Sequence, residues 1–233
     1  AQQYMETGAP NLGHLGILDG WIGRHLQTIA PVGTGNLRGI AIQSTLPRAM
    51  VGGPAVLPIK DPSNFDFPGN PALSSALRAV IEGTYGAAEE PLKGAAVSSL
   101  GAIDMLGNID FDNYQPANGA AYPADSFGEA LVSTAAMIKA DIGLECVEME
   151  IGGWDHHSGM GPVSGVLADK LANLSEGLSA FHSDMQAELG RVTLVVMTEF
   201  GRRVAENGSG GTDHGHGGTM FVMGGNVNGG QVH

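Results

Sequence analysis

The feature that most constrains the fold is a long apolar helical pattern lying between two β-rich segments. After Pro162, apolar residues recur mostly every three or four positions, which predicts an amphipathic helix over most of residues 163–189. The apolar positions are Val163, Val166, Leu167, Leu171, Leu174, Leu178, Phe181, Met185 and Leu189. The segments 144–151 and 192–198, one before and one after this helix, are typical of strands.

A strand, a helix and a second strand form a βαβ unit, in which the two strands normally lie parallel in one sheet. The segment 192–198 reads VTLVVMT, and a continuous apolar run of this kind is typical of a strand buried on both faces. Residues 219–224 predict a further strand. The sequence therefore predicts an α/β fold with a mostly parallel sheet, in which 144–151 and 192–198 are neighbours.

The rest of the chain contains weaker patterns. Further helices are expected over residues 71–83, 90–107 and 127–140, and short β segments over 37–59. A modest helical pattern near the N-terminus depends on four aliphatic residues, Leu15, Leu18, Ile22 and Leu26. Both ends of the chain read like the interior of a longer sequence. We therefore expect residues 1–233 to be a single α/β domain that is part of a larger one, completed by the rest of its own chain or by a partner chain.

Charge and composition exclude several classes of protein. Asp and Glu number 24 against 11 Lys and Arg, a formal net charge of −13, and no basic cluster is present. Nucleic acid is therefore not an expected partner, because a phosphate backbone would be repelled. No apolar run approaches the roughly 18 residues of a membrane span, so no transmembrane segment is expected. The single cysteine, Cys146, excludes an internal disulfide framework and a cysteine-based zinc site.

Two loops concentrate the residues that carry chemistry. Ligand sites in open parallel sheets lie beyond the carboxyl ends of the strands, which here are followed by loops 152–161 and 198–218. These loops contain four of the eight histidines and three carboxylates suited to metal binding: Asp155, His156, His157, Glu199, Asp213, His214 and His216. Imidazoles and carboxylates in this number predict a metal site with one or two ions.

The spacing suggests how the ligands divide. Asp155 and His157 are two residues apart in a glycine-flanked turn and can reach one ion. Asp213 and His214 are adjacent and normally point apart, so they either bridge toward two ions or divide between a ligand and a supporting residue. Glu199 is expected among the ligands or directly behind them.

Two arginines follow Glu199, and they are expected to differ. Arg202 should face the cluster, whereas Arg203 should be solvated or paired structurally. The alternative interpretation is that Glu199 and Arg202 pair only with each other.

Three stretches of the sequence resemble a known family: GGWDHH, TEFGRRVAENGSGGTDHGHGG, and the opening AQQYMETGAP together with GWIGRH. The chain resembles domain-of-unknown-function family 1501, which is grouped with the alkaline phosphatase and sulfatase superfamily, and the resemblance covers nearly the whole chain. It implies an alkaline phosphatase-like, doubly wound α/β fold with metals at the carboxyl edge of a mostly parallel sheet. It also implies an exported protein, periplasmic or extracellular.

The resemblance further implies a metal-dependent hydrolase of phosphate or sulfate esters, with a small anionic ester as substrate. The cofactor would be a divalent ion, with zinc, manganese, magnesium and calcium all left open. Asp155 and His157 resemble one Asp/His ligand pair, Glu199 or the pair Asp213–His214 resembles the later ligands, and Arg202 would contact the substrate or an oxyanion. No nucleophile is found in this chain. The alternative is a noncatalytic exported binding or structural protein on the same scaffold.

Overall fold

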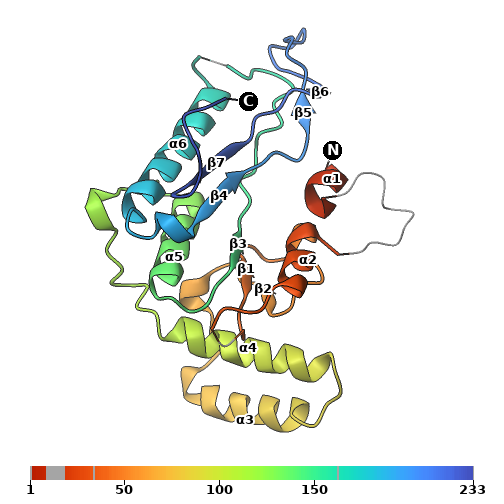
Figure 1. The fold of residues 1–233 in the computed structure, drawn as a ribbon, viewed down its shortest axis with the longest axis vertical. Helices are drawn as coiled ribbons and strands as arrows, with labels where there is room; N and C mark the ends of the chain where they lie inside the picture. The colour runs from red at the N-terminus through yellow and green to blue at the C-terminus, as the bar shows by residue number, and fades with distance from the viewer. Residues whose placement is uncertain (1, 9–18, 34, 162, 233) are drawn as a thin grey trace. The chain divides into compact units, whose positions relative to one another are not determined.

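The computed structural model describes residues 2–8, 19–33, 35–161 and 163–232, and its fold is shown in Figure 1. The chain divides into two compact units. The first, called here the antiparallel unit, is built from the described residues within Ala1–Leu15, Gln115–Ala135 and Ile151–His233. The second, the parallel unit, comprises Gly16–Tyr114 and Ala136–Glu150. Together they form a mixed α/β structure.

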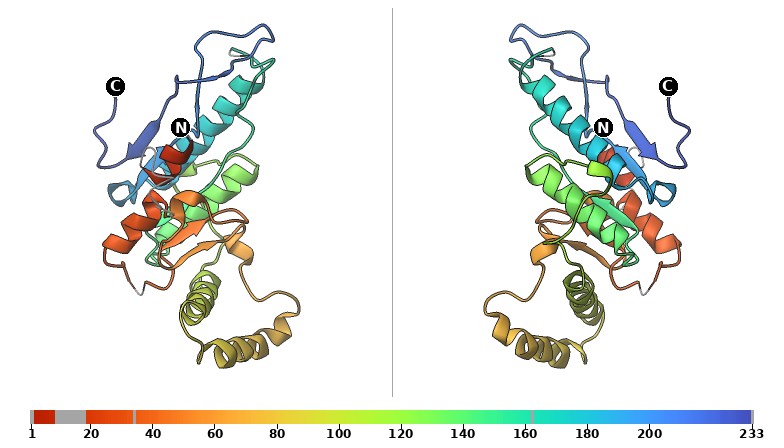
Figure 2. Two further views of the ribbon diagram at one scale, coloured as in Figure 1. Left: turned by 90° about the vertical axis from the view of Figure 1, so that its right-hand side faces the viewer. Right: turned by 90° about the vertical axis from the view of Figure 1, so that its left-hand side faces the viewer.

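The parallel unit contains a three-stranded parallel sheet in the order β2-β1-β3. Its strands are β1 (Gly39–Ala41), β2 (Val56–Pro58) and β3 (Cys146–Glu148). Ile40 on the central strand lies opposite Leu57 on one side and Val147 on the other. The helical elements of this unit are α2 (Trp21–Thr28), α3 (Ser74–Tyr85), α4 (Leu92–Gly107), and the short η2 (Arg48–Met50), η3 (Pro62–Asn64) and η4 (Pro71–Leu73). Figure 1 and Figure 2 show α3 and α4, the yellow and yellow-green helices, next to each other, and the two are in contact.

The core of the parallel unit surrounds the central strand. All three residues of β1 are buried, whereas β2 and β3 are only partly buried. The buried apolar cluster consists of Leu37, Ile40, Ile59, Ala102, Leu106 and Met137. Met137 comes from the last turns of α5 (Ser126–Lys139), so this helix contributes to the core although it begins in the antiparallel unit.

A buried ion pair stands beside this core. The Arg38 guanidinium donates to both carboxylate oxygens of Glu145, at 2.6 and 2.8 Å, and its side chain also donates to the carbonyls of Leu26 and Ile29. The two side chains are only 5% and 8% exposed. The hydrogen bonds from Arg38 lower the pKa of Glu145, which keeps the carboxylate ionised where it is buried. The pair therefore joins the start of β1 to the start of β3 and to the end of α2.

Replacing Glu145 tests this pair. The substitution Glu145→Ala leaves the Arg38 charge buried and unpaired, so the free energy of unfolding should fall by about 3 kcal/mol in urea titrations. The matched control is Asp104→Ala, which removes the partner of Arg78 in an exposed pair of the same unit and should cost less than about 1 kcal/mol. Because the pKa of Glu145 is lowered on folding, the pair stabilises at neutral pH and loses that contribution as the pH falls below the ordinary glutamate pKa. Equal losses for the two variants would contradict this role.

The antiparallel unit contains two separate strand pairs. Strand β4 (Thr193–Val196) pairs antiparallel with β7 (Phe221–Gly224), and β5 (Gly201–Arg202) pairs antiparallel with β6 (His214–Gly215). The helical elements are α1 (Gln2–Thr7), the first part of α5, α6 (Val166–Asp184), and the short η5 (Ala117–Gly119) and η6 (Leu189–Arg191). No helix in the described part of the chain is long and apolar enough to cross a membrane.

The expected pairing of 144–151 with 192–198 is wrong. Strand β3 pairs with β1, whereas β4 pairs with β7, and the two belong to different units. The expectation that 192–198 is buried on both faces is also wrong, because Thr193 and Val195 are exposed. A run of apolar residues indicates a strand, but it does not indicate which other strand will pair with it.

The predicted helices fare better. Helix α6 lies within 163–189 and is unbroken at Leu174, although it starts at Val166, after Gly165, and ends at Asp184. Helices α3, α4 and α5 and strand β7 match the predicted segments, and β1 and β2 fall within 37–59. Of the N-terminal pattern, Ile22 and Leu26 lie on α2, and Leu15 and Leu18 lie outside the described residues.

Helices α5 and α6 approach closely at Gly177. A side-chain carbon added at this position would overlap the Phe127 ring and meet Leu131 at 3.0 Å. Gly177→Ala should therefore lower the free energy of unfolding by about 1–3 kcal/mol, despite the better helix propensity of alanine. The control is Gly83→Ala on α3, where nothing lies within 4 Å and the same change should stabilise by about 0.5–1 kcal/mol. Stabilisation by both substitutions in thermal and urea unfolding would refute the close contact.

Candidate metal centre

Two loops of the antiparallel unit are joined through their backbones. The first loop follows residue 151, and the second connects β4 to β7 and includes the β5–β6 pair. The Gly159 and Met160 amides donate to the carbonyls of Ser209 and Gly210 at 3.0 and 2.7 Å, and the Thr212 amide donates to the His156 carbonyl at 3.1 Å. These bonds align the two loops side by side, so residues about 50 positions apart in the sequence become neighbours.

A glycine makes the close approach possible. A side-chain carbon on Gly211 would overlap the backbone carbonyl carbon of His157 and lie within 2.6 Å of its oxygen. Only a residue without a side chain fits here. The glycine-rich composition of the second loop thus has a direct structural role in bringing Asp213 and His214 against the first loop.

The Asp155 carboxylate is the meeting point of the cluster. Its Oδ1 atom lies 3.1 Å from Nε2 of His157 and 3.0 Å from Nε2 of His214. Asp155, His157 and His214 are called here the triad. One donor atom from each of them lies within 4.8 Å of the other two, a separation that could hold a metal ion. All three side chains are about half exposed, at 51%, 49% and 51%. The hydrogen bond with His214, helped by the charges of His157, His214 and Arg202, lowers the pKa of Asp155.

Asp213 occupies a different position from these three residues. Its Oδ1 lies 3.2 Å from Nδ1 of His157, the ring nitrogen that does not face Asp155. Asn207 donates to the same oxygen at 3.1 Å. The hydrogen bond from Asn207 and then that with His157 lower the pKa of Asp213. Asp213 therefore contacts a member of the triad and is not one of the three residues whose donor atoms converge.

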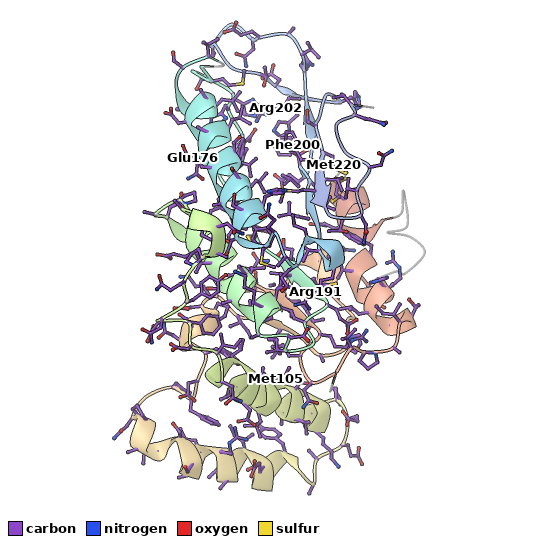
Figure 3. All side chains as sticks on the ribbon, turned by 60° about the vertical axis from the view of Figure 1, so that its left-hand side comes forward. Met105, Glu176, Arg191, Phe200, Arg202 and Met220 are labelled. Carbon is purple, nitrogen blue, oxygen red and sulfur yellow. The ribbon has the colours of Figure 1, made fainter. Side chains whose placement is uncertain are left out.

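Arg202, on β5, connects the two loops. Its guanidinium donates to the Thr212 carbonyl and to Asp155, and at 3.3 Å to the His156 carbonyl. It also lies 5.5 Å from the centre of the Phe200 ring, and both residues are labelled in Figure 3. The Phe200 ring in turn stacks on His214, with centroids 4.0 Å apart. One face of His214 is thus covered by an aromatic ring, while its Nε2 faces Asp155.

Of the five residues expected as metal ligands, the structure brings three together. Glu199 is exposed and, within the described part of the chain, makes no hydrogen bond or ion pair with the triad. Alternate residues of an extended chain share a face, and here that face belongs to Phe200 and Arg202. The alternative pairing of Glu199 with Arg202 does not occur, because Arg202 pairs with Asp155.

Two residues of the cluster were missed by the sequence interpretation. Asn207 accepts the Ser209 and Gly211 amides with its side-chain oxygen, and its side-chain nitrogen reaches the His157 carbonyl at 2.9 Å. The Asn-Gly dipeptide at 207–208 is a turn signal and could have marked this residue. Phe200 had no such signal, because a single aromatic residue in a sequence is usually interpreted as part of the hydrophobic core.

Nearly the whole chain matches a known family model. That model is described as a protein of unknown function (DUF1501), and the match covers residues 6–233. The chain belongs to the DUF1501 family. No curated protein and no solved structure matches the chain. In this DUF1501 chain the match includes both loops and every residue of the triad.

The two adjacent arginines provide a matched test of the loop connection. Arg202 joins Asp155, Thr212 and His156, whereas Arg203 is exposed and contributes its backbone amide to the Asp213 carbonyl at 2.9 Å. Arg202→Met should remove hydrogen bonds worth about 1.5–3 kcal/mol and speed amide hydrogen exchange at Thr212 correspondingly. Arg203→Met should leave that exchange rate nearly unchanged. Similar exchange rates in the two variants would show that Arg202 does not join the loops.

Proposed function

We propose that this DUF1501 chain is a metal-dependent hydrolase of phosphate or sulfate esters. The observation that carries the proposal is the convergence of Asp155 Oδ1 with the Nε2 atoms of His157 and His214, at 3.1 and 3.0 Å. One carboxylate and two imidazoles form the donor set of known catalytic zinc sites. With three protein ligands, coordination positions remain for water and for a substrate oxygen.

The types of donor favour some divalent ions over others. Imidazole nitrogen suits zinc and neighbouring transition metals, and manganese accepts mixed nitrogen and oxygen donors. Calcium and magnesium prefer sites built from oxygen alone. Of the four divalent ions left open by the sequence, we therefore propose zinc or manganese for this centre. Magnesium and calcium suit these donors less well.

Each part of the cluster has a role in the proposed reaction. A bound divalent ion supplies Lewis-acid stabilisation of an ester oxygen and a more acidic bound water. Asp155, His157 and His214 hold that ion. Arg202 places a cation beside Asp155 and would attract the negative charge of a phosphate or sulfate group. Phe200 supports the His214 ring from one face. No side-chain nucleophile is assigned.

The proposal extends to the scaffold and location implied by the resemblance. An alkaline phosphatase- or sulfatase-like scaffold is supported by the parallel sheet of the β2-β1-β3 order and by the Asp/His donor set. Export to the periplasm or the extracellular medium is supported by the sequence resemblance alone. Fractionation of the native cells, followed by detection of the protein, tests this part.

Metal titration tests the centre directly. Zinc or manganese should bind the purified protein in calorimetric titrations, and Asp155→Ala or His214→Ala should weaken binding by more than about 100-fold, because even supporting residues cost 10–100-fold. The matched control is His182→Ala, an exposed histidine on α6 outside the cluster, which should leave the affinity unchanged. Equal affinity in all variants would refute the centre.

Activity assays separate the hydrolase from its alternative. The metal-loaded protein should hydrolyse nitrophenyl phosphate or nitrophenyl sulfate, and Asp155→Ala should abolish that activity. Metal binding without hydrolysis of either ester would instead favour the noncatalytic binding protein.

A further inference from the structure

We propose that Asp213 is a positioning residue that holds His157 in the orientation and tautomer needed for metal binding, and that it is not itself a ligand. This inference rests on the proposed metal centre. The sequence leaves two arrangements open for the adjacent Asp213 and His214, and this inference selects the one in which His214 is the ligand and Asp213 supports another ligand.

The two nitrogens of the His157 ring face two different carboxylates. Nε2 lies 3.1 Å from Asp155 Oδ1, on the side of the triad, and Nδ1 lies 3.2 Å from Asp213 Oδ1. An ionised carboxylate only accepts hydrogen bonds, and a neutral imidazole carries a single N–H. When the Nδ1 proton is donated to Asp213, the Nε2 lone pair is free to bind an ion between Asp155 and His214. Histidines that bind metals commonly depend on a carboxylate in this way.

Asp213 is itself held in place by Asn207. The Asn207 amide nitrogen donates to Asp213 Oδ1 at 3.1 Å and to the His157 carbonyl at 2.9 Å. Its oxygen accepts the Ser209 and Gly211 amides at 3.0 and 3.1 Å. The Asn207 side chain thus fixes the Asp213 carboxylate relative to the backbone of His157, the residue whose ring Asp213 orients. Asp213 Oδ1 therefore has two partners, the Asn207 side chain and Nδ1 of His157, which is the ring nitrogen that does not face Asp155.

His214 is supported differently from His157. Its ring stacks on Phe200 with centroids 4.0 Å apart, and its Nε2 lies 3.0 Å from Asp155. Loss of the Asp213 side chain should therefore remove the partner of His157 Nδ1 and leave His214 stacked on Phe200. This asymmetry distinguishes a positioning role from a general loosening of the loop.

Zinc affinity measures the size of the effect. Asp213→Asn keeps an oxygen that can accept from Nδ1 but loses the charge, and should weaken zinc binding by about 10-fold; Asp213→Ala loses both and should weaken it by up to about 100-fold. The matched control is Glu206→Gln, which removes one charge from an exposed carboxylate of the same loop and should change the affinity by less than about 2-fold. Thermal unfolding of each variant checks that it folds.

Nuclear magnetic resonance provides a readout other than activity. In zinc-loaded protein with ¹⁵N-labelled histidine, the Nδ1 proton of His157 should be visible and protected from exchange with water. Asp213→Ala should remove that protection, while nuclear Overhauser contacts between the His214 and Phe200 rings persist. A purely structural role would remove those contacts as well.

The outcomes separate this inference from the proposed function. If the unaltered protein binds neither zinc nor manganese, the metal centre fails and the inference fails with it. If it binds zinc and Asp213→Ala binds equally well with His157 Nδ1 still protected, only the positioning role is overturned. If Asp213→Asn changes the visible absorption of the cobalt-loaded protein and binds as weakly as Asp155→Ala, Asp213 is a ligand, and the inference is overturned in that way too.

Discussion

The side chains of the two loops converge on one oxygen atom, Oδ1 of Asp155. Two imidazole nitrogens lie about 3 Å from it, and the Arg202 guanidinium donates to it. In the described residues, the loops contain no regular structure beyond strands of two residues, so hydrogen bonds between the loops fix the positions of these side chains. Because the carboxylate is half exposed, water screens each of these interactions, and their combined geometry matters more than the strength of any one of them.

The parallel unit is organised by the opposite arrangement, a charge pair that is almost completely buried. Arg38 and Glu145 satisfy each other and the carbonyls at the end of α2, next to a core that surrounds Ile40. Removing either Arg38 or Glu145 leaves the charge of the other residue buried and unpaired, which strongly lowers the free energy of unfolding. Removing one partner of Asp155 leaves groups that water can solvate. The Arg38–Glu145 pair therefore stabilises the fold, whereas the cluster around Asp155 contributes less to stability and is the proposed binding site.

Sequence patterns predicted the helices well because the helical period is a local property. The apolar spacing located α6, but both of its ends were misjudged. Val163 lies before the start of the helix, and Met185 and Leu189 continue the apolar pattern beyond its end. Strand partners are not local, so the run that became β4 gave no sign that it pairs with β7. The sequence was enough to predict that Asp155, His157 and His214 lie in one cluster. It was not enough to predict the position of Glu199, because the face of an extended segment depends on its neighbours in space.

The position of Arg202 links the binding of cations to the binding of anions in the proposed centre. A guanidinium against Asp155 competes with a divalent ion for the same oxygen and repels it. An anionic ester placed between the ion and Arg202 would be attracted by both and would reduce that repulsion. By thermodynamic linkage, each ligand then strengthens the binding of the other. The proposed site would thus hold its ion best in the presence of the substrate on which the ion is proposed to act.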